Sequence, residues 1–238
     1  MDKGQIPYIS IVIPAYNEEK RLSDTLRRIT AYMDKEKYSY ELIVVDDGST
    51  DGTIKILSGI KEKTRNLKII SNGTNQGKGA SVRTGVLQSK GEYILFSDSD
   101  LSTPIEEMES FVKHLEQGYD IVIGSRSMKN SNILIHQPFY RELMGKIFNR
   151  IVNTVVFKGI IDTQCGFKMF KRLPAIELFS SQKINGYAFD VEVLYNAIRK
   201  KYKIKELPVK WINSPASKVN PVTSSIQMLY DILRIKFK

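Results

Sequence analysis

The chain has 238 residues, of which 42% are hydrophobic and 26% charged, a composition typical of one globular domain. A single cysteine, Cys165, excludes an internal disulfide and fits a reducing compartment. There is no run of about 18 apolar residues, and the first residues lack the apolar core of a signal peptide. The sequence therefore predicts neither a membrane-spanning helix nor a cleaved leader.

Positive charge gathers toward the C-terminal end of a chain whose net charge is +10. Between residues 199 and 238, ten Lys or Arg side chains stand against two acidic ones, Glu206 and Asp231. This excess indicates either an anionic partner, such as phosphate, acidic lipid or nucleic acid, or a basic face that is simply solvated.

The first half of the sequence alternates between two periodicities. Short apolar runs rich in β-branched residues predict strands at 8–14, 41–46, 67–71, 92–98 and 119–124. Apolar residues spaced three and four apart predict helices at 18–37, 51–65, 79–89 and 105–117. This alternation favours an α/β fold with a mostly parallel central sheet flanked by helices on both faces.

The second half is less regular. Helical spacing predicts helices at 138–157, 190–201 and 224–238, and a strand is expected at 203–211. Residues 213–223 contain two prolines and small polar residues, so we expect a loop. The expected organisation is one α/β domain over 1–212, followed at 213–238 by a basic loop and an amphipathic C-terminal helix.

The most unusual residues follow predicted strands. They are Pro14-Ala15-Tyr16-Asn17-Glu18 after the first strand, Asp46-Asp47-Gly48-Ser49 after the second and Asp98-Ser99-Asp100 after the fourth. In an open, mostly parallel sheet, ligands bind at the carboxyl ends of the strands. The sequence therefore predicts that these segments share one ligand site.

Asp98 and Asp100 are candidates for holding a metal ion. Residues i and i+2 of an extended strand point to the same side, and two adjacent carboxylates repel unless a cation lies between them. A hard divalent ion such as Mg²⁺ or Mn²⁺, bridging to a diphosphate, suits oxygen ligands of this kind. D-x-D is also common in surface turns, but here it follows the buried-looking strand YILFS.

Two further segments are candidates for binding a nucleotide. Asp46 and Asp47 belong to a D-D-G turn that needs only one acid, so the other is available to a base or a ribose. In NQGKGA, Gly77 and Gly79 are expected to let the backbone approach a ligand, and Lys78 is placed for a phosphate. Neither the Walker spacing nor G-x-G-x-x-G is present, so a P-loop kinase or a dinucleotide-dependent oxidoreductase is unsupported.

At this point the sequence resembles a known family. The blocks IVIPAYNEE, VVDDGSTDGT, NQGKGASVRTG and FSDSDLSTP are similar to those of family 2 glycosyltransferases with the Rossmann-like GT-A fold. The blocks DTQCGFKMF and GYAFDVE resemble the dolichyl-phosphate β-glucosyltransferases and other polyprenyl-phosphate glycosyltransferases. The resemblance runs from about residue 9 to the C-terminus and makes 1–212 the catalytic domain.

The resemblance implies a role for each residue that matches a motif. Asp98 and Asp100 would hold the metal and the diphosphate, whereas Ser102 stands where some relatives carry Gln, so no third side-chain ligand is identified. The acceptor phosphate would contact Arg126, Arg141 and Lys218. The nucleotide-sugar site would comprise Pro14, Ala15, Tyr16, Asn17, Glu18, Asp47 and Asp98, to which the residue patterns described above add Asp46, Gly77 and Lys78.

The implied reaction is an inverting transfer of a hexose to a polyprenyl or dolichyl phosphate, with UDP-glucose favoured as donor and GDP-mannose as the alternative. The second pKa of a phosphate monoester lies near ~6, so the acceptor is largely ionised at neutral pH and needs no strong base. A glycan hydroxyl as acceptor would need a carboxylate base, for which Asp162 and then Asp190 are the candidates. Both could instead be helix caps or turn residues.

A lipid acceptor has to be reached at a membrane surface. Helices 138–157 and 224–238 are amphipathic and basic, so we expect a cytoplasmic protein peripherally associated with the membrane, although such helices commonly pack on a core. A non-catalytic protein that binds nucleic acid or membrane by charge alone would explain the net charge but not the carboxylate clusters. We therefore expect no nucleic-acid partner, and the sequence does not predict the oligomeric state.

Overall fold

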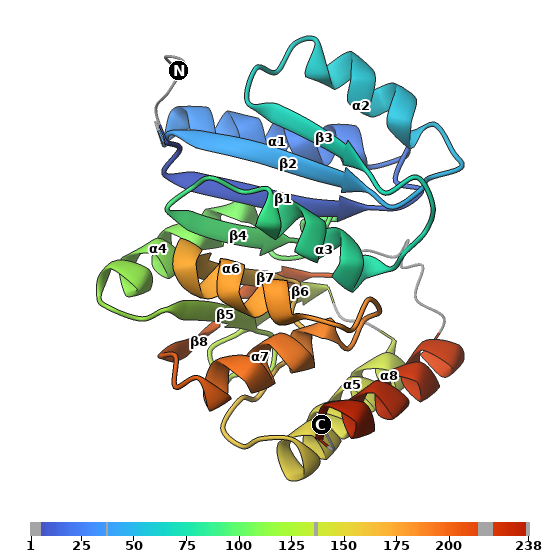
Figure 1. The fold of residues 1–238 in the computed structure, drawn as a ribbon, viewed down its shortest axis with the longest axis vertical. Helices are drawn as coiled ribbons and strands as arrows, with labels where there is room; N and C mark the ends of the chain where they lie inside the picture. The colour runs from blue at the N-terminus through green and yellow to red at the C-terminus, as the bar shows by residue number, and fades with distance from the viewer. Residues whose placement is uncertain (1–5, 37, 136–137, 214–220, 237–238) are drawn as a thin grey trace.

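The computed structural model describes residues 6–36, 38–135, 138–213 and 221–236. These residues form three layers, a central sheet between two layers of helices (Figure 1). In spatial order, the main sheet of the described chain consists of β3 (Leu67–Ser71), β2 (Tyr40–Asp46), β1 (Ile9–Ala15), β4 (Tyr93–Ser97), β7 (Phe167–Lys171), β5 (Ile121–Ser125) and β8 (Ile204–Pro208). The α/β fold expected from the sequence is confirmed.

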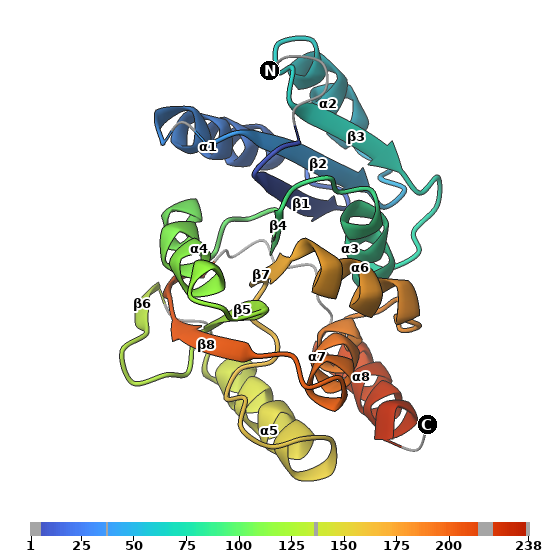
Figure 2. The ribbon, with the colours of Figure 1, turned by 60° about the vertical axis from the view of Figure 1, so that its left-hand side comes forward.

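Helices cover both faces of this sheet, on opposite sides in Figure 2. The elements packed on one face are α1 (Leu22–Lys35), α2 (Thr53–Lys61), the 3₁₀ turn η1 (Ile105–Glu107) and α4 (Met108–Glu116). Those on the other are α3 (Lys78–Leu87), α6 (Arg172–Ser181) and α7 (Phe189–Arg199), followed outward by α5 (Phe139–Val155) and α8 (Pro221–Lys236). Strand β1 is apolar throughout its centre because both of its faces are buried, as in other parallel sheets.

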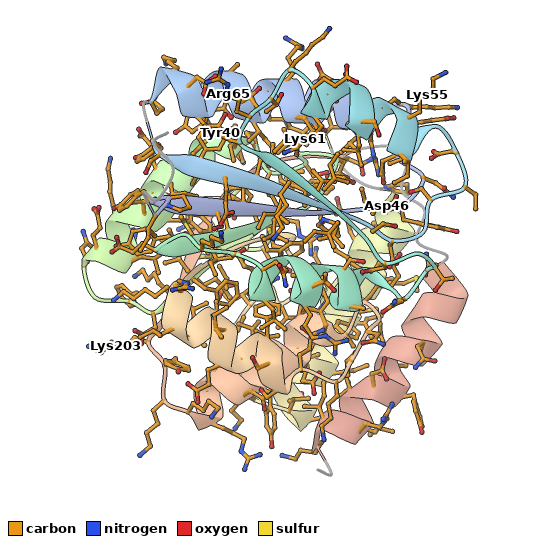
Figure 3. The ribbon with its side chains drawn as sticks, turned by 45° about the horizontal axis from the view of Figure 1, so that its top comes forward. Tyr40, Asp46, Lys55, Lys61, Arg65 and Lys203 are labelled. Carbon is orange, nitrogen blue, oxygen red and sulfur yellow. The ribbon has the colours of Figure 1, made fainter. Side chains whose placement is uncertain are left out.

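The parallel strands end at the same edge of the sheet, which positions the site. Strands β1, β2 and β4 run parallel, with Ala15 opposite Asp46 at the carboxyl ends of β1 and β2. Figure 3 marks Tyr40 and Asp46 at the two ends of β2. The three polar segments that follow these strands therefore meet at one edge.

The second half of the chain departs from the predicted elements. Strand β7 lies antiparallel between β4 and β5, and helix α6 follows it directly; neither was predicted. Pro174 stands in the first turn of α6, where a missing N–H is tolerated. The predicted strand 203–211 is two strands, β8 and β9 (Lys210–Ile212), because β9 leaves the main sheet to pair with β6 (Asn132–Ile135). None of the described helices is long and apolar enough to cross a bilayer.

Candidate active site

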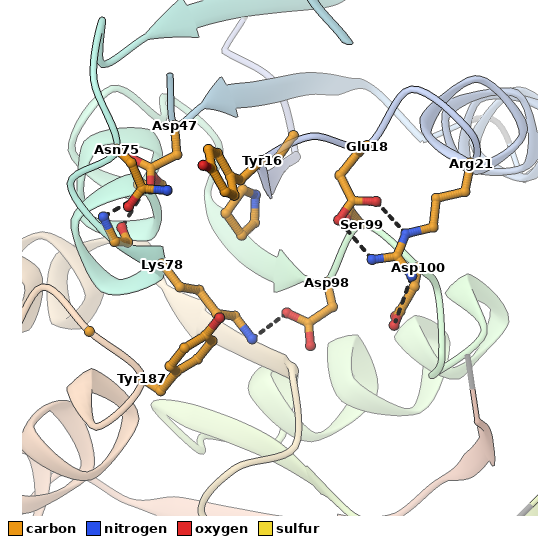
Figure 4. Close-up of a pocket in the computed structure, with 15 residues that line it drawn as sticks. Tyr16, Glu18, Arg21, Asp47, Asn75, Lys78, Asp98, Ser99, Asp100 and Tyr187 are labelled. Carbon is orange, nitrogen blue, oxygen red and sulfur yellow. Dashed lines mark hydrogen bonds and ion pairs between the residues drawn. The ribbon is translucent and has the colours of Figure 1, made fainter. Parts of the chain in front are cut away.

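A pocket of about 280 Å³ opens at the carboxyl ends of β1, β2 and β4, where the sequence predicts a ligand site. Both carboxylates of the D-x-D pattern face it together with two cations, Lys78 and Arg21 (Figure 4). Its lining residues are Pro14, Ala15, Tyr16, Glu18, Arg21, Asp47, Asn75, Gly77, Lys78, Ser81, Asp98, Ser99, Asp100, Gly186 and Tyr187.

Lys78 and Asp98 form an ion pair inside the pocket. Nζ of Lys78, at the first position of α3, lies 2.6 Å from Oδ1 of Asp98, which directly follows β4. Burial alone would lower the pKa of Lys78, but the charges of Asp98 and Asp190 raise it above its usual value. Lys78 is thus a permanent cation in the wall of the pocket.

A turn after β4 brings Asp100 back toward Asp98. Residues 99–100 form this turn, and Leu101 has a φ of 46°. The two carboxylates share the pocket because of the turn, and not because they alternate along a strand as the sequence pattern suggested. Oδ1 of Asp100 accepts a hydrogen bond from the backbone N–H of Ser102 at 3.0 Å, which holds the turn closed.

Arg21 is a second cation of the pocket, and it was not assigned from the sequence. Its guanidinium donates two hydrogen bonds to the Glu18 carboxylate, one of them 2.7 Å long from Nη2 to Oε1. Its Nη1 lies 3.8 Å from Oδ2 of Asp100. Burial alone would lower the pKa of Arg21, but Glu18 and Asp100 raise it. Each D-x-D carboxylate therefore faces one cation.

The carboxylate oxygens in the pocket are suitable ligands for a hard divalent cation. Asp98 and Asp100 both direct carboxylate oxygens into the pocket. Burial and the charge of Asp98 raise the pKa of Asp100, and a bound cation would stabilise its ionised form. Across the described ranges, no group of three or more His, Cys, Asp or Glu side chains could hold a metal. Oxygens of a bound diphosphate and of water are suitable further ligands for such an ion.

The opposite end of the pocket has the features of a nucleoside site. Tyr16 projects into the pocket and is 37% exposed, with Pro14 and Ala15 beside it in the lining (Figure 4). Asp47 lines the same end and accepts hydrogen bonds from the backbone N–H groups of residues 76–77, at 3.0 and 2.8 Å. Asp47 therefore both lines the pocket and holds the loop before α3.

Asn17 and Asp46, also expected in the nucleotide site, do not line the pocket but build the turns beside it. Asp46 is 1% exposed and accepts hydrogen bonds from the N–H groups of Gly48 and Ser49. Asn17 has a φ of 55°, and its Oδ1 accepts the Thr50 N–H at 2.7 Å. Both residues support the wall of the pocket from behind.

The glycines around Lys78 allow a close contact within the protein, and Gly77 also lines the pocket. Gly77 has a φ of 101°, and a Cβ there would lie 2.5 Å from the carbonyl oxygen of Asn185. A Cβ on Gly79 would lie 2.7 Å from the carbonyl oxygen of Ile184. Small residues are needed because the start of α3 packs on the segment 184–186, which brings Gly186 and Tyr187 into the pocket wall.

Arg126 and Asp162 form a second ion pair, which lies outside the pocket lining and in which Asp162 is fully buried. Nε and Nη2 of Arg126 donate to the two oxygens of Asp162 at 2.7 and 2.9 Å, and the backbone N–H of Arg126 adds a third bond. Burial raises the pKa of Asp162, but Arg126 outweighs it, and the result is a pKa of about 2. The Arg126 guanidinium also lies over the ring of Trp211, 5.8 Å from its centroid. This geometry favours Asp162 as the partner that orients Arg126.

The remaining residues expected at the site are placed as follows. Asp190 is 3% exposed and lies 2.7 Å from Nζ of Lys168, so it does not line the pocket. Arg141 belongs to α5, but its side chain lies outside the described part of the chain. Lys218 lies outside the described residues.

Residues 10–179 match glycosyl transferase family 2. The chain belongs to this family.

Relatives of this family 2 chain share similarity over nearly its whole length. The dolichyl-phosphate beta-glucosyltransferase of Dictyostelium discoideum is 38% identical over 97% of this chain and 74% of that protein. The Homo sapiens protein of the same name is 37% identical over 97% of this chain and 75% of that protein. The chain is therefore a glycosyltransferase of the dolichyl-phosphate β-glucosyltransferase-like kind.

Solved structures share its fold. Glucosyl-3-phosphoglycerate synthase from Mycobacterium tuberculosis, in complex with Mn²⁺, UDP-glucose and glycerol 3-phosphate, aligns with a TM-score of 0.73 at 20% identity, over 97% of this chain and 80% of that one. Mannosyltransferase PcManGT from Pyrobaculum calidifontis, in complex with GDP-Man and Mn²⁺, aligns with a TM-score of 0.65 at 19% identity, over 97% and 65% of the two chains. The GT-A fold implied by the sequence resemblance is thus confirmed.

Several lining residues of this family 2 fold were not assigned from the sequence. Arg21 stands three residues after Glu18, a spacing that pairs side chains at a helix start and could have indicated it. Tyr187 and Gly186 lie in the GYAFDVE block but come from a distant part of the chain. No local signal places them opposite Lys78, because that contact depends on how α3 packs against the segment before α7.

Proposed function

We propose that this family 2 chain transfers glucose, with inversion, from UDP-glucose to a dolichyl or other polyprenyl phosphate. The observation that carries the proposal is the meeting of Asp98, Asp100, Lys78 and Arg21 in one pocket at the carboxyl ends of the parallel strands. The names of the relatives that are more than a third identical over 97% of the chain support the choice of donor sugar and acceptor.

The donor occupies the pocket between β1 and β4 in this proposal. Asp98 and Asp100 hold Mg²⁺ or Mn²⁺, which when bound neutralises charge on the leaving diphosphate. Lys78 supplies a further positive charge, fixed by the backbone of α3, at the same place. Tyr16, Asp47 and their neighbours in the lining contact the nucleoside, with Asn17 and Asp46 supporting them.

The acceptor phosphate needs orientation more than it needs a base. A monoester phosphate is largely dianionic at neutral pH, since its second pKa is about 6. Arg126, whose side chain is 25% exposed, orients the phosphate with Arg141 and Lys218, while Asp162 fixes the plane of the Arg126 guanidinium. The low pKa of Asp162, about 2, makes it a poor acceptor for a hydroxyl proton at neutral pH.

A membrane-facing surface on α5 would bring the lipid acceptor to this site. Phe139, Leu143 and Ile147 follow each other at four-residue spacing and are 79%, 44% and 51% exposed. Lys146 and Arg150 on the same helix are exposed as well. An exposed apolar row with neighbouring cations suits the interface of an anionic bilayer. Helix α8 contacts α5 and lies beside it in Figure 1.

A transfer assay tests the function. The purified chain would receive Mg²⁺ or Mn²⁺, polyprenyl phosphate in detergent, and radiolabelled UDP-glucose or GDP-mannose in parallel. We expect label to enter the organic phase from UDP-glucose, with Asp100→Ala reducing the rate by about 10³-fold through loss of charge stabilisation in the pocket. Asp24→Ala, at an exposed carboxylate of α1, is the matched control and should keep full activity.

The assay separates the proposal from its alternatives. Label entering the lipid from GDP-mannose alone would replace glucose by mannose in the proposal. No transfer to the lipid from either donor, with metal-dependent hydrolysis of one donor, would indicate a glycan hydroxyl as acceptor. In that case either Asp162→Asn or Asp190→Asn should abolish turnover, because a hydroxyl nucleophile requires a base.

A further inference from the structure

A buried ion pair lies behind the pocket, and the proposed chemistry does not use it. Nζ of Lys168 in β7 lies 2.7 Å from Oδ1 of Asp190 in α7, and the two side chains are 2% and 4% exposed. The same Nζ donates a hydrogen bond to the carbonyl oxygen of Cys165 at 2.6 Å. Burying two charges is unfavourable even when they pair, and apolar residues of similar volume are often equally stable in their place. Stability alone therefore gives little reason for this pair.

The buried pair continues the ion pair of the pocket into the interior. The ammonium groups of Lys78 and Lys168 both lie close to the ring of Phe96, at 5.3 and 5.9 Å from its centroid. Asp190 interacts electrostatically with Lys78 as well as with Lys168. From the pocket inward, charges thus alternate in sign through Asp98, Lys78, Asp190 and Lys168.

Packing around the pair keeps Asp190 at a fixed place relative to Lys78. Phe189, the residue before Asp190, meets Phe96 edge-on, with ring centroids 5.7 Å apart. A Cβ on Gly79 would lie 2.6 Å from the Cβ of Phe189, so the first turns of α3 and α7 are in direct contact. Lys78 and Asp190 stand at these two helix starts, which leaves little freedom between them.

We propose that Asp190, held by Lys168, is a positioning residue that sets the Lys78 ammonium in the wall of the donor pocket. This inference rests on the proposed function, in which Lys78 contacts the donor diphosphate. A lysine side chain is long and flexible, and a carboxylate behind it narrows the positions of its ammonium. Asp190 does not line the pocket, so it acts through Lys78 and not on the substrate.

Lys168 has a separate part in this arrangement. Asp190 without Lys168 would be a buried carboxylate that still interacts with the positive charge of Lys78. It would then draw the Lys78 ammonium inward, away from Asp98 and the pocket. Because Nζ of Lys168 lies 2.7 Å from Oδ1 of Asp190, Asp190 already has a counter-ion. It therefore attracts Lys78 without drawing the Lys78 ammonium away from Asp98. Lys168 is therefore the direct ion-pair partner of Asp190, and Lys78 remains available to the donor.

Removing both buried charges together tests this role. The double variant K168M/D190N replaces the pair by neutral side chains of similar size, so it should unfold near the wild-type temperature. Its Kd for uridine diphosphate with Mn²⁺, measured by calorimetry, should rise by about ten-fold or more, and KM for the donor should rise more than kcat falls. The exposed pair Glu177–Lys200, with a separation of 2.6 Å, provides the control E177Q/K200M, which should bind as the wild type does.

A second comparison shows whether Asp190 acts through Lys78. In a K78M background, adding K168M/D190N should change the Kd by less than about two-fold, because the side chain being positioned is gone. A further ten-fold loss there, or a wild-type Kd in the folded K168M/D190N variant, would overturn the proposal. Should the double variant not fold, D190E keeps both buried charges paired but moves the carboxylate relative to Lys78, and it allows the same two comparisons.

The wild-type chain also distinguishes this inference from the function on which it rests. Binding of uridine diphosphate or guanosine diphosphate by the wild type, with unchanged affinity in K168M/D190N, would overturn only the positioning role. A wild-type chain that binds neither nucleotide would overturn the proposed donor site, and the role of Asp190 with it.

Discussion

Gly166 lies directly beneath the carboxylate of Asp98. A Cβ at position 166 would lie 2.0 Å from Oδ2 of Asp98, and the carbonyl oxygen of Gly166 accepts the Asp98 N–H at 3.0 Å. Gly166 directly precedes β7, the strand that contains Lys168. Asp98 takes its place in the pocket because position 166 has no side chain.

Gly166→Ala is expected to displace that carboxylate. The methyl group meets the end of a flexible side chain, so the fold should survive while Asp98 moves. A displacement of about 1 Å at a reacting centre can reduce a rate by about 10²-fold, and we expect a loss of kcat/KM of this order in the transfer assay.

The control for this variant is Gly59→Ala in α2, where a Cβ meets nothing within 4 Å. It should keep full activity and raise the free energy of unfolding by up to about 1 kcal/mol, since Ala is the better helix former. Full activity in Gly166→Ala would mean that the position of Asp98 against Gly166 is not needed for turnover.

Lys78→Met removes one charge from the pocket and keeps the length of the side chain. If Lys78 contacts the donor diphosphate, the Kd for uridine diphosphate should rise by about 10–100-fold, the usual range for a lost charge-assisted hydrogen bond. Calorimetry in the presence of Mn²⁺ measures it. Lys55→Met, on the exposed side of α2 (Figure 3), is the matched control. An equal Kd for Lys78→Met and Lys55→Met would contradict the assignment of Lys78 to the donor site.

Asp162 should make the fold acid-sensitive. Its pKa is lowered to about 2 in the folded state, below the usual value near 3.8. A group of this kind stabilises the fold fully above its unfolded pKa, and the contribution is lost as the pH falls from about 4 toward 2. The shift in pKa corresponds to about 2 kcal/mol of the free energy of unfolding.

Urea unfolding of the wild type and of Asp162→Asn at neutral pH and at pH about 3 checks this expectation. Asp162→Asn should be the less stable at neutral pH, and the difference should narrow in acid. Asp24→Asn, whose carboxylate is more than half exposed, should show no such difference. If the free energies of unfolding of the wild type and Asp162→Asn differ by the same amount at neutral pH and in acid, the low pKa of Asp162 is contradicted.

The exposed apolar row on α5 should mediate binding to membranes. The double variant Phe139→Ser, Leu143→Ser removes two of its side chains, so the protein should sediment less with vesicles containing anionic lipid at low salt. Leu173→Ser is the matched control, because Leu173 is 81% exposed but lies on α6. Sedimentation of the wild type should fall as salt is raised, since its cations contribute. Equal sedimentation of all three proteins would place the membrane contact elsewhere.

The sequence by itself determined the regular half of the fold and the place of the site. The apolar strands and amphipathic helices up to β5 follow from local periodicity, which depends only on neighbouring residues. The carboxyl ends of parallel strands carry the polar segments, so their meeting at one edge could be predicted. In the D-D-G turn, Asp46 holds the turn and Asp47 faces the pocket, whereas the sequence did not distinguish the two acids.

Only the tertiary structure decided the contacts between distant segments. Strand β7 escaped prediction because FKMFK places Lys168 at a position that is fully buried, and a buried lysine is stable only beside a partner such as Asp190. The function of Gly77 likewise depends on the segment that packs against it. Charge pairs and close backbone approaches of this kind join residues far apart in the chain, and no local pattern specifies them.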